Sequence, residues 1–348
     1  MVDVDVAHGA DELIPADSRD RVVRAQRALQ AFGNRLQHAI ADGMSLKIIA
    51  RDLGTLYAAA VGAEQGAVSP APASSWAAHA GTLRRFANGP LDEFFVRRWE
   101  SLPWSRCAPL PADRPDGSMH LSHIRAFDTE VPLPAGISAP RQEELLISAL
   151  AAALAGESGS RGGAVEVCRH GRTDLTGGPG HFDAVGWLNS ITPYVLALPG
   201  PGATDTVTAA ALRAQIGEIR DMEQTWGALR HLHDAPGVRA RIAALPAPDV
   251  YLNFLGSHMH ELETAGPFRP RHGDVGTEMT LDRTQPYRVK IYAETETETE
   301  TGAGAGAGPG AATVRLKWQY SADVDDESRI RRLAASCGRL LQRLARCP

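Results

Sequence analysis

The stretch Gln37-His38-Ala39-Ile40-Ala41-Asp42-Gly43-Met44-Ser45 has the pattern of a short extended segment that ends in a turn at Asp42-Gly43. Gly43 allows the backbone to leave the extended segment sharply. Ser45 is a suitable N-cap for a helix that continues to about residue 60. One face of that helix is marked by apolar residues at three- and four-residue steps, namely Leu46, Ile49, Leu53, Leu56 and Tyr57.

Outward from this stretch, helical and extended patterns alternate along the chain. Helices are predicted at about 19–32, 76–101 (interrupted near Gly89-Pro90), 140–154, 205–220 and 327–345. Extended segments are predicted at about 119–127, 164–169, 249–256, 287–293 and 313–321, and a segment at 187–198 is left without an assigned conformation. This alternation favours an α/β sandwich in two lobes.

Two segments of biased composition divide the chain further. The Pro-rich stretch 103–116 separates a predicted N-terminal lobe, residues 1–115, from a C-terminal lobe, residues 116–348. The Glu-Thr repeats and Gly-Ala repeats at about 294–311 can supply no core, so we expect a disordered insertion between two strands.

Composition limits the class of protein. The 348 residues carry a net charge of −5, with 43% hydrophobic residues, so the chain can bury a core and has no overall attraction to nucleic acid or anionic lipid. The arginines of 329–346 fit the solvated face of an amphipathic helix. The four cysteines are scattered, which supports neither a disulfide framework nor a zinc ribbon. No signal-peptide or membrane-spanning pattern is present, so we expect a cytoplasmic protein.

Three segments in order carry a family resemblance. They are the stretch at 37–45, then Cys168-Arg169-His170-Gly171-Arg172 with Val185-Gly186-Trp187-Leu188-Asn189-Ser190 and Pro193, and finally Tyr251-Leu252-Asn253-Phe254-Leu255-Gly256. They resemble the signatures H-H-x-x-x-D-G, E-G-H-G-R, V-G-W-F-T-x-x-x-P and F-N-Y-L-G of the condensation/epimerization superfamily of nonribosomal peptide synthetases. The segments 226–230 and 316–321 look like the epimerization branch in particular.

The resemblance implies a two-lobed, chloramphenicol-acetyltransferase-like fold with a tunnel between the lobes. Substrates would arrive as thioesters on the phosphopantetheine arm of a carrier protein, with no bound cofactor or metal. His38 matches the working histidine of the family, and an imidazole suits proton transfer near neutral pH. Asp42 would be structural and pair with an arginine such as Arg172. Trp187 and Asn253 would line the site.

The chain departs from the family pattern at three places. Gln37 replaces the leading histidine of the motif, which tends to support the site. Cys168 and Arg169 replace the Glu and Gly of E-G-H-G-R, so the expected second proton-transfer group is missing. The segment before His38 is also short, which implies an abbreviated N-terminal lobe, a remnant, or an incorrectly placed start codon.

Three residues could fill the missing role. Cys168 could act as a thiolate, and Arg169 is close enough in sequence to lower its pKa. Glu166 lies on the same strand face at about 6.6 Å, so it would need a shift in strand register. His170 would share that face as well.

Each of these residues also has an ordinary structural interpretation. His38 could be satisfied by backbone hydrogen bonds at a strand end, and Cys168 could be a small buried hydrophobe. The large aromatic residues Trp187, Trp226 and Trp318 suit core or tunnel-wall packing.

His231-x-His233 and His258-x-His260 have no third ligand nearby in sequence, so a metal site is not predicted. Neither a phosphate-binding glycine loop nor the G-x-S-x-G element of a hydrolase is present.

The sequence therefore predicts a stand-alone domain of nonribosomal peptide biosynthesis that epimerises a carrier-bound aminoacyl or peptidyl thioester through His38. Two alternatives stay open. One is condensation-type acyl transfer, which needs no Glu at position 168. The other is a degenerate module that only docks a carrier protein or a partner enzyme.

Overall fold

The computed structural model describes residues 3–6, 41–60, 75–173, 175, 180–256, 268–271, 283–297 and 312–347. The chain packs into two compact units that interleave along the sequence. Unit 1 contains residues 1–82, 170–189 and 258–279, and unit 2 contains residues 83–169, 190–257 and 280–348. The two predicted lobes, 1–115 and 116–348, remain a prediction.

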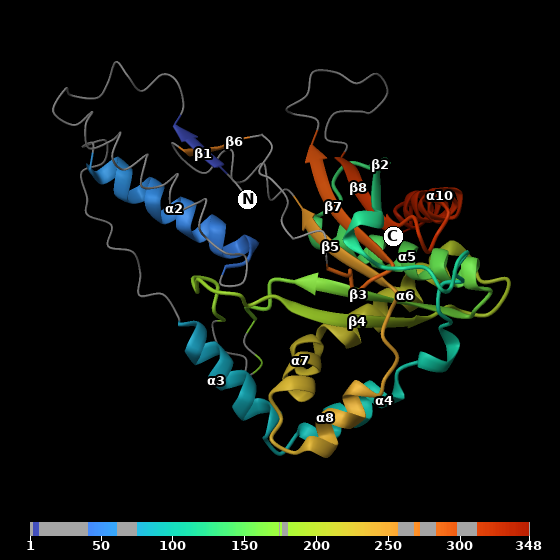
Figure 1. The fold of residues 1–348 in the computed structure, drawn as a ribbon, viewed down its shortest axis with the longest axis horizontal. Coiled ribbons are helices and arrows are strands. Elements are labelled where there is room, and N and C mark those ends of the chain that lie inside the picture. Colours follow the sequence, from blue (N-terminus) through green and yellow to red (C-terminus); the bar gives the residue numbers. More distant parts are fainter. Residues whose placement is uncertain are drawn as a thin grey trace. The chain divides into compact units, whose positions relative to one another are not determined.

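A mixed sheet forms the centre of unit 2 (Figure 1). Its strands follow the order β2-β8-β7-β5-β3-β4, in which β3–β5 and β5–β7 are parallel and the other neighbours antiparallel. The bounds are β2 Ile124–Leu133, β3 Gly162–Arg169, β4 Ser190–Ala197, β5 Val250–Gly256, β7 Val289–Thr297 and β8 Ala312–Ser321. The predicted α/β class is confirmed.

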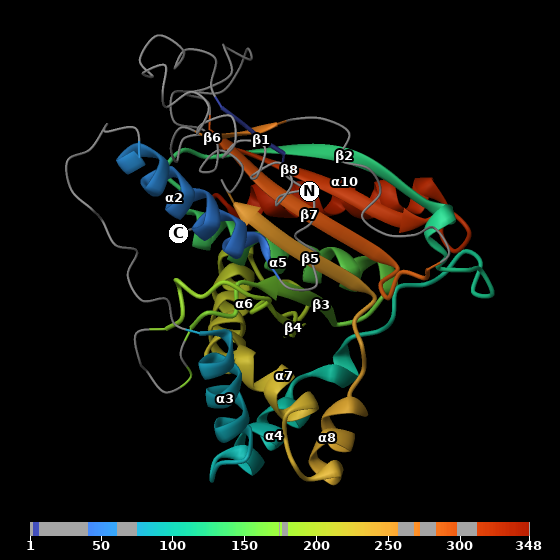
Figure 2. The same ribbon diagram turned by 60° about the vertical axis from the view of Figure 1, so that its left-hand side comes forward.

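Helices cover one face of this sheet (Figures 1 and 2). They are α5 (Ala139–Ser158), α6 (Asp205–Arg220) and α10 (Glu327–Leu344). Side chains alternate across a strand, so Val165 and Val167 of β3 point to the helices and are fully buried. Gly163 shares that face, where a Cβ would lie 2.1 Å from the carbonyl oxygen of Ala151, so glycine allows α5 to approach β3 closely.

Three shorter helices pack together in the same unit, namely α4 (Asp92–Ser101), α7 (Glu223–His231) and α8 (Pro236–Ala243). Trp226 of α7 packs edge-on against Trp99 of α4, with ring centroids 5.1 Å apart, and both are buried. Neither α7 nor α8 was predicted from the sequence.

The predicted interruption of the helix at 76–101 near Gly89-Pro90 is present. The helix divides there into α3 (Trp76–Ala87) and α4.

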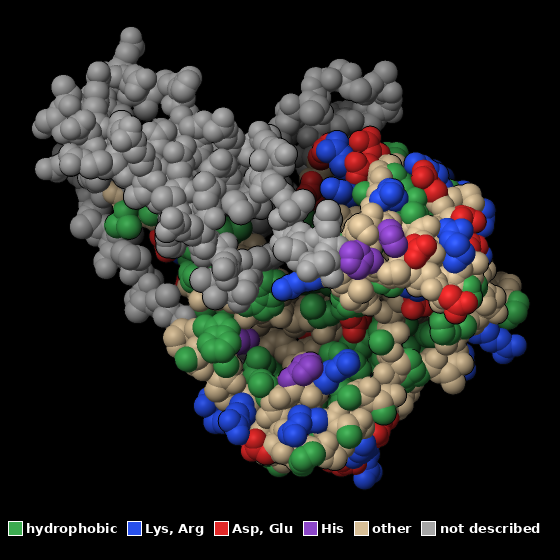
Figure 3. All heavy atoms as spheres, viewed as in Figure 1, with side chains coloured by type: hydrophobic (Ala, Val, Ile, Leu, Met, Phe, Trp, Pro, Cys, Tyr) green, Lys and Arg blue, Asp and Glu red, His purple; other side chains and the backbone are tan. Residues whose placement is uncertain are grey.

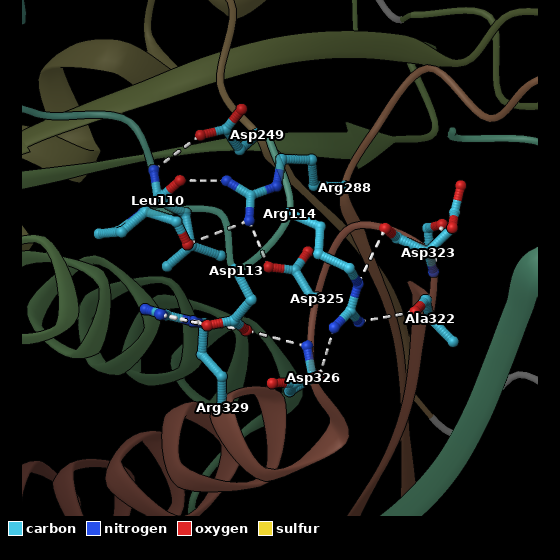
Figure 4. Close-up of polar contacts among 12 residues, drawn as sticks. Leu110, Asp113, Arg114, Asp249, Arg288, Ala322, Asp323, Asp325, Asp326 and Arg329 are labelled. Atoms are coloured by element: carbon cyan, nitrogen blue, oxygen red, sulfur yellow. Dashed lines mark hydrogen bonds and ion pairs between the residues drawn. The ribbon is translucent and has the colours of Figure 1, made fainter. Parts of the chain in front are cut away.

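The Pro-rich segment is fixed to the start of α10 by ion pairs (Figure 4). Arg114 donates to the carbonyl oxygens of Ala322 and Asp323 and pairs with Asp326 at 2.7 Å. Asp113 pairs with Arg329 of α10 at 2.5 Å. The stretch predicted as a lobe boundary is therefore anchored within unit 2.

The predicted insertion at 294–311 begins too early. Residues 294–297 belong to β7 and pair with β8 as far as Thr297↔Ala312, so the strand continues into the Glu-Thr repeat. The alternation of Glu and Thr suits a strand, because Thr295 is buried and donates to Gln142 at 2.7 Å while Glu296 pairs with Arg315 at 2.8 Å. Residues 298–311 lie outside the described residues, as do the predicted helix at 19–32, residues 61–74 and residues 176–179.

Other predicted elements agree more closely with the structure. α6 spans the predicted range 205–220, and α5 has Pro140 in its first turn. β2 begins at Ile124 rather than near residue 119, because Leu121–His123 forms a 3₁₀ turn. Within the described ranges, no helix combines the length and apolar character needed to cross a bilayer. On the face shown in Figure 3, basic and acidic side chains of unit 2 are interspersed.

Candidate functional site

A buried ion pair joins two of the sequence motifs inside unit 1. Arg172 donates from Nη1 to Oδ2 of Asp42 and from Nη2 to Oδ1, each at 2.8 Å, and both side chains are fully buried. Two parallel bonds of this kind are the strong, directional form of an Arg–carboxylate contact. The pairing expected between Asp42 and Arg172 is therefore present.

Asp42 also caps helix α2 (Gly43–Ala60). Its Oδ1 accepts from the backbone N–H of Ser45 at 2.9 Å and its Oδ2 from that of Leu188 at 3.0 Å. The prediction that Ser45 is the N-cap is wrong, because the helix begins two residues earlier, at Gly43. The Ser45 hydroxyl instead donates to the carbonyl oxygen of Gly186 at 2.8 Å.

The electrostatics of Asp42 follow from these contacts. Burial by itself would raise the pKa of the Asp42 carboxyl, but the Arg172 guanidinium and the two backbone N–H groups hold that pKa below its ordinary value. Asp42 is therefore a fixed anion. It connects the start of α2 to Arg172 and Leu188, which agrees with the structural role expected for it.

The neighbouring motif residues of unit 1 are also placed. Gly171 has φ 61°, a left-handed conformation that favours glycine, and the Arg172 N–H donates to Nδ1 of His170 at 3.0 Å. The Trp187 carbonyl oxygen accepts from the Trp76 indole at 3.0 Å. The Trp187 side chain is 39% exposed, so core packing is wrong for it, whereas Trp226 and Trp318 are buried. Gln37 and His38 lie outside the described residues.

In unit 2, the sheet face opposite α5 carries a run of polar and aromatic side chains. We name it the polar sheet face and define it as Glu166, Cys168, Tyr251, Asn253, Lys290 and Tyr292. The strand register sets these residues beside one another, since Glu166 pairs with Tyr251, Cys168 with Asn253, and Asn253 with Tyr292. Two of the candidates, Glu166 and Cys168, therefore share one surface with the predicted lining residue Asn253.

Glu166 is held by a tyrosine that was not predicted from the sequence. The Tyr287 hydroxyl donates to Oε2 of Glu166, and the Tyr287 ring lies on that of Tyr251 with centroids 5.0 Å apart. Burial raises the pKa of Glu166, and the Tyr287 hydrogen bond and the charge of Arg230 offset part of that increase. No sequence pattern indicates this contact, because it joins residues 121 positions apart.

Cys168 is 6% exposed and lies beside Tyr251, whose hydroxyl hydrogen-bonds to it. The expectation that Arg169 lowers the pKa of this thiol is wrong, because adjacent strand residues point to opposite faces of a sheet. Arg169 reaches the helix side, where it pairs with Glu143 of α5 and, at 3.1 Å, with Glu223 of α7. β3 ends at Arg169, so His170 lies outside the strand and its expected place on the face of Cys168 stays a prediction.

Arg169 and its partners form a second buried charge group, which we name the β3 ion cluster: Glu143, Arg169, Arg220 and Glu223. Burial raises the pKa of both glutamates despite the two arginines. The Tyr194 hydroxyl, fully buried on β4, donates to Glu223 at 3.2 Å. This cluster was not predicted from the sequence, and it ties the end of β3 to α5, α6 and α7.

The register of β3 is regular on both sides. β3 pairs without interruption with β4 from Gly162↔Ala197 to Arg169↔Ser190, and Glu166 to Cys168 pair in step with β5. The register therefore does not bring Glu166 to the position of Cys168. Glu166 lies two residues earlier in β3, on the same face.

Metal binding has no support in the described ranges, where His, Cys, Asp and Glu form no group of three suited to an ion. His231 is the last residue of helix α7. The His233 ring contacts Asp92 at 3.1 Å. His258 and His260 lie outside the described residues.

Comparison with known proteins agrees with the resemblance seen in the sequence. No family model matches the chain. The chain is 30% identical over 235 residues to one component of the linear gramicidin synthase of Brevibacillus parabrevis, a match that covers 63% of this chain and 4% of that protein. It is 28% identical over 275 residues to a chondramide synthase of Chondromyces crocatus, covering 73% of this chain and 7% of that protein. The chain thus spans only a small fraction of the curated relatives that it matches.

Two solved structures show the same fold. The epimerization domain from the third module of tyrocidine synthetase B superposes with a TM-score of 0.69 at 20% identity, covering 88% of this chain and 67% of that one. The first condensation domain of the calcium-dependent antibiotic synthetase gives 0.56 at 15% identity, with 88% and 65% coverage. The chain therefore has the fold of these epimerization and condensation domains.

Proposed function

We propose that this domain epimerises the α-carbon of an aminoacyl or peptidyl thioester carried on the phosphopantetheine arm of a separate carrier protein, with His38 as the proton-handling residue. The observation that carries the proposal is the buried Asp42–Arg172 pair. It links the aspartate of Gln37–Gly43 to the arginine of Cys168–Arg172 across 130 positions, which is the structural pairing that the resemblance implies. His38 lies four positions before this anchored aspartate in the sequence.

The proposed chemistry is a proton exchange at carbon. The thioester carbonyl makes the α-proton acidic, and one group removes it to leave an enolate. A second group then returns a proton to the opposite face. An imidazole with a pKa near its ordinary value of about 6.5 suits the first role. Cys168 and His170 are the candidates for the second role, whereas Glu166 would need a shift in the strand register, which is uninterrupted along β3.

A second function is condensation-type acyl transfer, in which His38 orients an amine or alcohol that attacks the thioester. The regular register of β3 favours this alternative, because it leaves a thiol where two-base epimerisation in the family uses a carboxylate. Both functions use the same proposed substrate, a thioester bound to a carrier protein. A domain that binds the loaded carrier and does neither would be a docking module.

The test is an exchange assay in deuterated water. The protein is incubated with carrier-bound L-aminoacyl thioester, and deuterium at the α-carbon and the ratio of enantiomers are measured. Deuterium uptake with formation of the D-isomer supports epimerisation. A condensed product without α-exchange supports acyl transfer. Neither exchange nor condensed product, with retained carrier binding, supports docking.

His38→Ala should remove whichever activity is found, by about 10²-fold or more if the imidazole is the general base. His123→Ala is the matched control, because it removes another histidine whose contact is with Asp323 at 3.4 Å in unit 2. Cys168→Ala, Glu166→Gln and His170→Ala are then compared with L- and D-thioesters separately. Loss of the group on one face blocks exchange from one enantiomer more than from the other. Unchanged exchange in His38→Ala contradicts the proposal.

A further inference from the structure

One oxygen of Glu166 has no partner within the part of the chain that the structure describes. Tyr287 donates to Oε2, whereas no hydrogen bond reaches Oε1 from the described residues. The side chain is on the polar sheet face with a residue exposure of 7%, and Oε1 is not among the fully enclosed polar atoms left without a partner. A carboxylate oxygen at the surface of a largely buried site is an acceptor for a donor brought by a ligand.

The surroundings of this oxygen suit a cationic donor. The rings of Tyr251, Tyr287 and Tyr292 lie together, with Tyr251 5.0 Å from Tyr287 and 6.4 Å from Tyr292. The Lys290 ammonium is 5.9 Å from the centre of the Tyr251 ring, so this aromatic group already receives one cation. Electron-rich ring faces beside a carboxylate are a favourable environment for an ammonium group.

The charged groups that face Glu166 from neighbouring elements do not neutralise it by contact. Arg230 of α7 acts on Glu166 through its charge, but among the described residues it forms no ion pair with that carboxylate; its guanidinium lies 5.6 Å from the Trp226 ring. Lys290 of β7 lies over Tyr251, and Cys168, Tyr251 and Tyr287 are further titratable side chains of the described residues on or beside this face. Glu166 therefore keeps an accessible oxygen for an incoming donor.

The position of Glu166 along β3 matches the size of an amino acid. Glu166 is two residues before Cys168 in β3, which is about 6.6 Å along the strand. Suppose that the side chain at position 168 contacts the substrate α-carbon at about 3 Å. The α-nitrogen is one bond of about 1.5 Å from that carbon. It then lies within hydrogen-bond distance of the carboxylate at position 166. The regular register, which prevents Glu166 from replacing the residue at position 168, thus sets it at a distance suited to the α-nitrogen.

We infer that Glu166, held by Tyr287, binds the α-ammonium group of an aminoacyl thioester, so that the site selects a free α-amine over an N-acylated, peptidyl chain. This inference rests on the proposed function, because it concerns the substrate of that same site. Glu166 is then a substrate-binding residue, and Tyr287 is a positioning residue that orients its carboxylate.

Binding of non-hydrolysable probes tests the inference without requiring turnover. An aminoacyl pantetheine amide and its N-acetyl derivative are titrated against the whole chain, and the ratio of the two Kd values is measured. The wild-type protein should bind the free amine about tenfold or more tightly, as expected for a charge-assisted hydrogen bond. Equal binding, or tighter binding of the acetylated probe, overturns the inference.

Variants locate the selectivity. Glu166→Gln should bring the Kd ratio close to one by weakening the amine probe while changing the acetylated probe less than about twofold. Tyr287→Phe should reduce the ratio partially. Glu130→Gln, which alters an exposed glutamate of β2 whose contact is with Arg315, should leave it unchanged. A Glu166→Gln variant that weakens both probes equally contradicts the inference.

The two proposals fail in different ways. A protein that prefers the free amine but performs neither exchange nor transfer on loaded carriers would retain the inference and lose the proposed function. A protein that processes aminoacyl and peptidyl carriers with equal kcat/KM and binds both probes equally would retain the proposed function and lose the inference.

Discussion

The two buried charge groups of this domain are built on neighbouring arginines but respond to burial differently. In unit 1, Arg172 and two backbone N–H groups surround Asp42 and keep its pKa below the ordinary value. In unit 2, Arg169 and Arg220 lie beside two glutamates, and burial still raises the pKa of both. The contacts differ in the same way: both oxygens of Asp42 accept hydrogen bonds, whereas the contacts of Glu143 and Glu223 with described residues go to Oε2 alone.

The largest expected effect is that of Arg172→Met. It leaves Asp42 buried with its charge unpaired, so the free energy of unfolding should fall by about 3–5 kcal/mol. Denaturant unfolding of the purified protein measures the change. Asp42→Asn in the same chain should restore part of the loss by removing the charge. Arg332→Met on the exposed side of α10 is the control. A loss below about 1 kcal/mol would show that the pair does not stabilise the fold.

Arg169→Met should have a smaller effect, on the order of 2 kcal/mol at pH 7, because Glu143 and Glu223 can take up protons. A carboxyl whose folded-state pKa is raised contributes stability below its unfolded pKa, near 4.5, and loses it as pH increases. Arg169 stabilises the ionised form of the two glutamates. The loss in free energy of unfolding caused by Arg169→Met should therefore grow from pH 5 to pH 8, as these glutamates ionise. The contribution of Asp42 has the opposite sign, since its lowered pKa makes that stability disappear as pH falls below about 4. Parallel pH profiles for the two regions would contradict the comparison.

Tyr287→Phe should have the smallest effect on stability, about 1 kcal/mol for one hydrogen bond. Because the Tyr287 hydroxyl stabilises the ionised form of Glu166, its removal should move the pKa of Glu166 farther above the ordinary value. Titration followed by carbon NMR of glutamate-labelled protein measures the shift. Tyr292→Phe serves as a nearby control. An unchanged or lower pKa in Tyr287→Phe would show that the hydroxyl does not stabilise that carboxylate.

The sequence predicted the fold class and most of the sheet, because buried strands and amphipathic helices leave strong apolar patterns. α6 and α10 agree closely with their predicted ranges, and the Asp42–Arg172 pair was expected from the family resemblance. α7 and α8 were missed because short helices carry few periodic positions. Residues 294–297 of the Glu-Thr repeat were misread because their composition suggested disorder, while their two-residue alternation suited the end of β7.

The contents of the polar sheet face were less predictable. Glu166 and Cys168 could be assigned to one face from their spacing, but their partners Tyr287 and Tyr251 come from other parts of the chain and depend on register. The side on which Arg169 points was also misjudged, since proximity in sequence is not proximity of side chains within a strand. The catalytic assignment of His38, and of the second proton-transfer group, stays a proposal.

The pairing of β7 with β8 has a practical consequence. Strand partners stay in step from Val289↔Tyr320 to Thr297↔Ala312, so the core of unit 2 is complete on both sides of residues 298–311. A reporter domain could be spliced there, or the two strands joined by a tight hairpin turn, with the hydrogen-bonded ladder left intact. This gives a route to a fluorescent form of the protein.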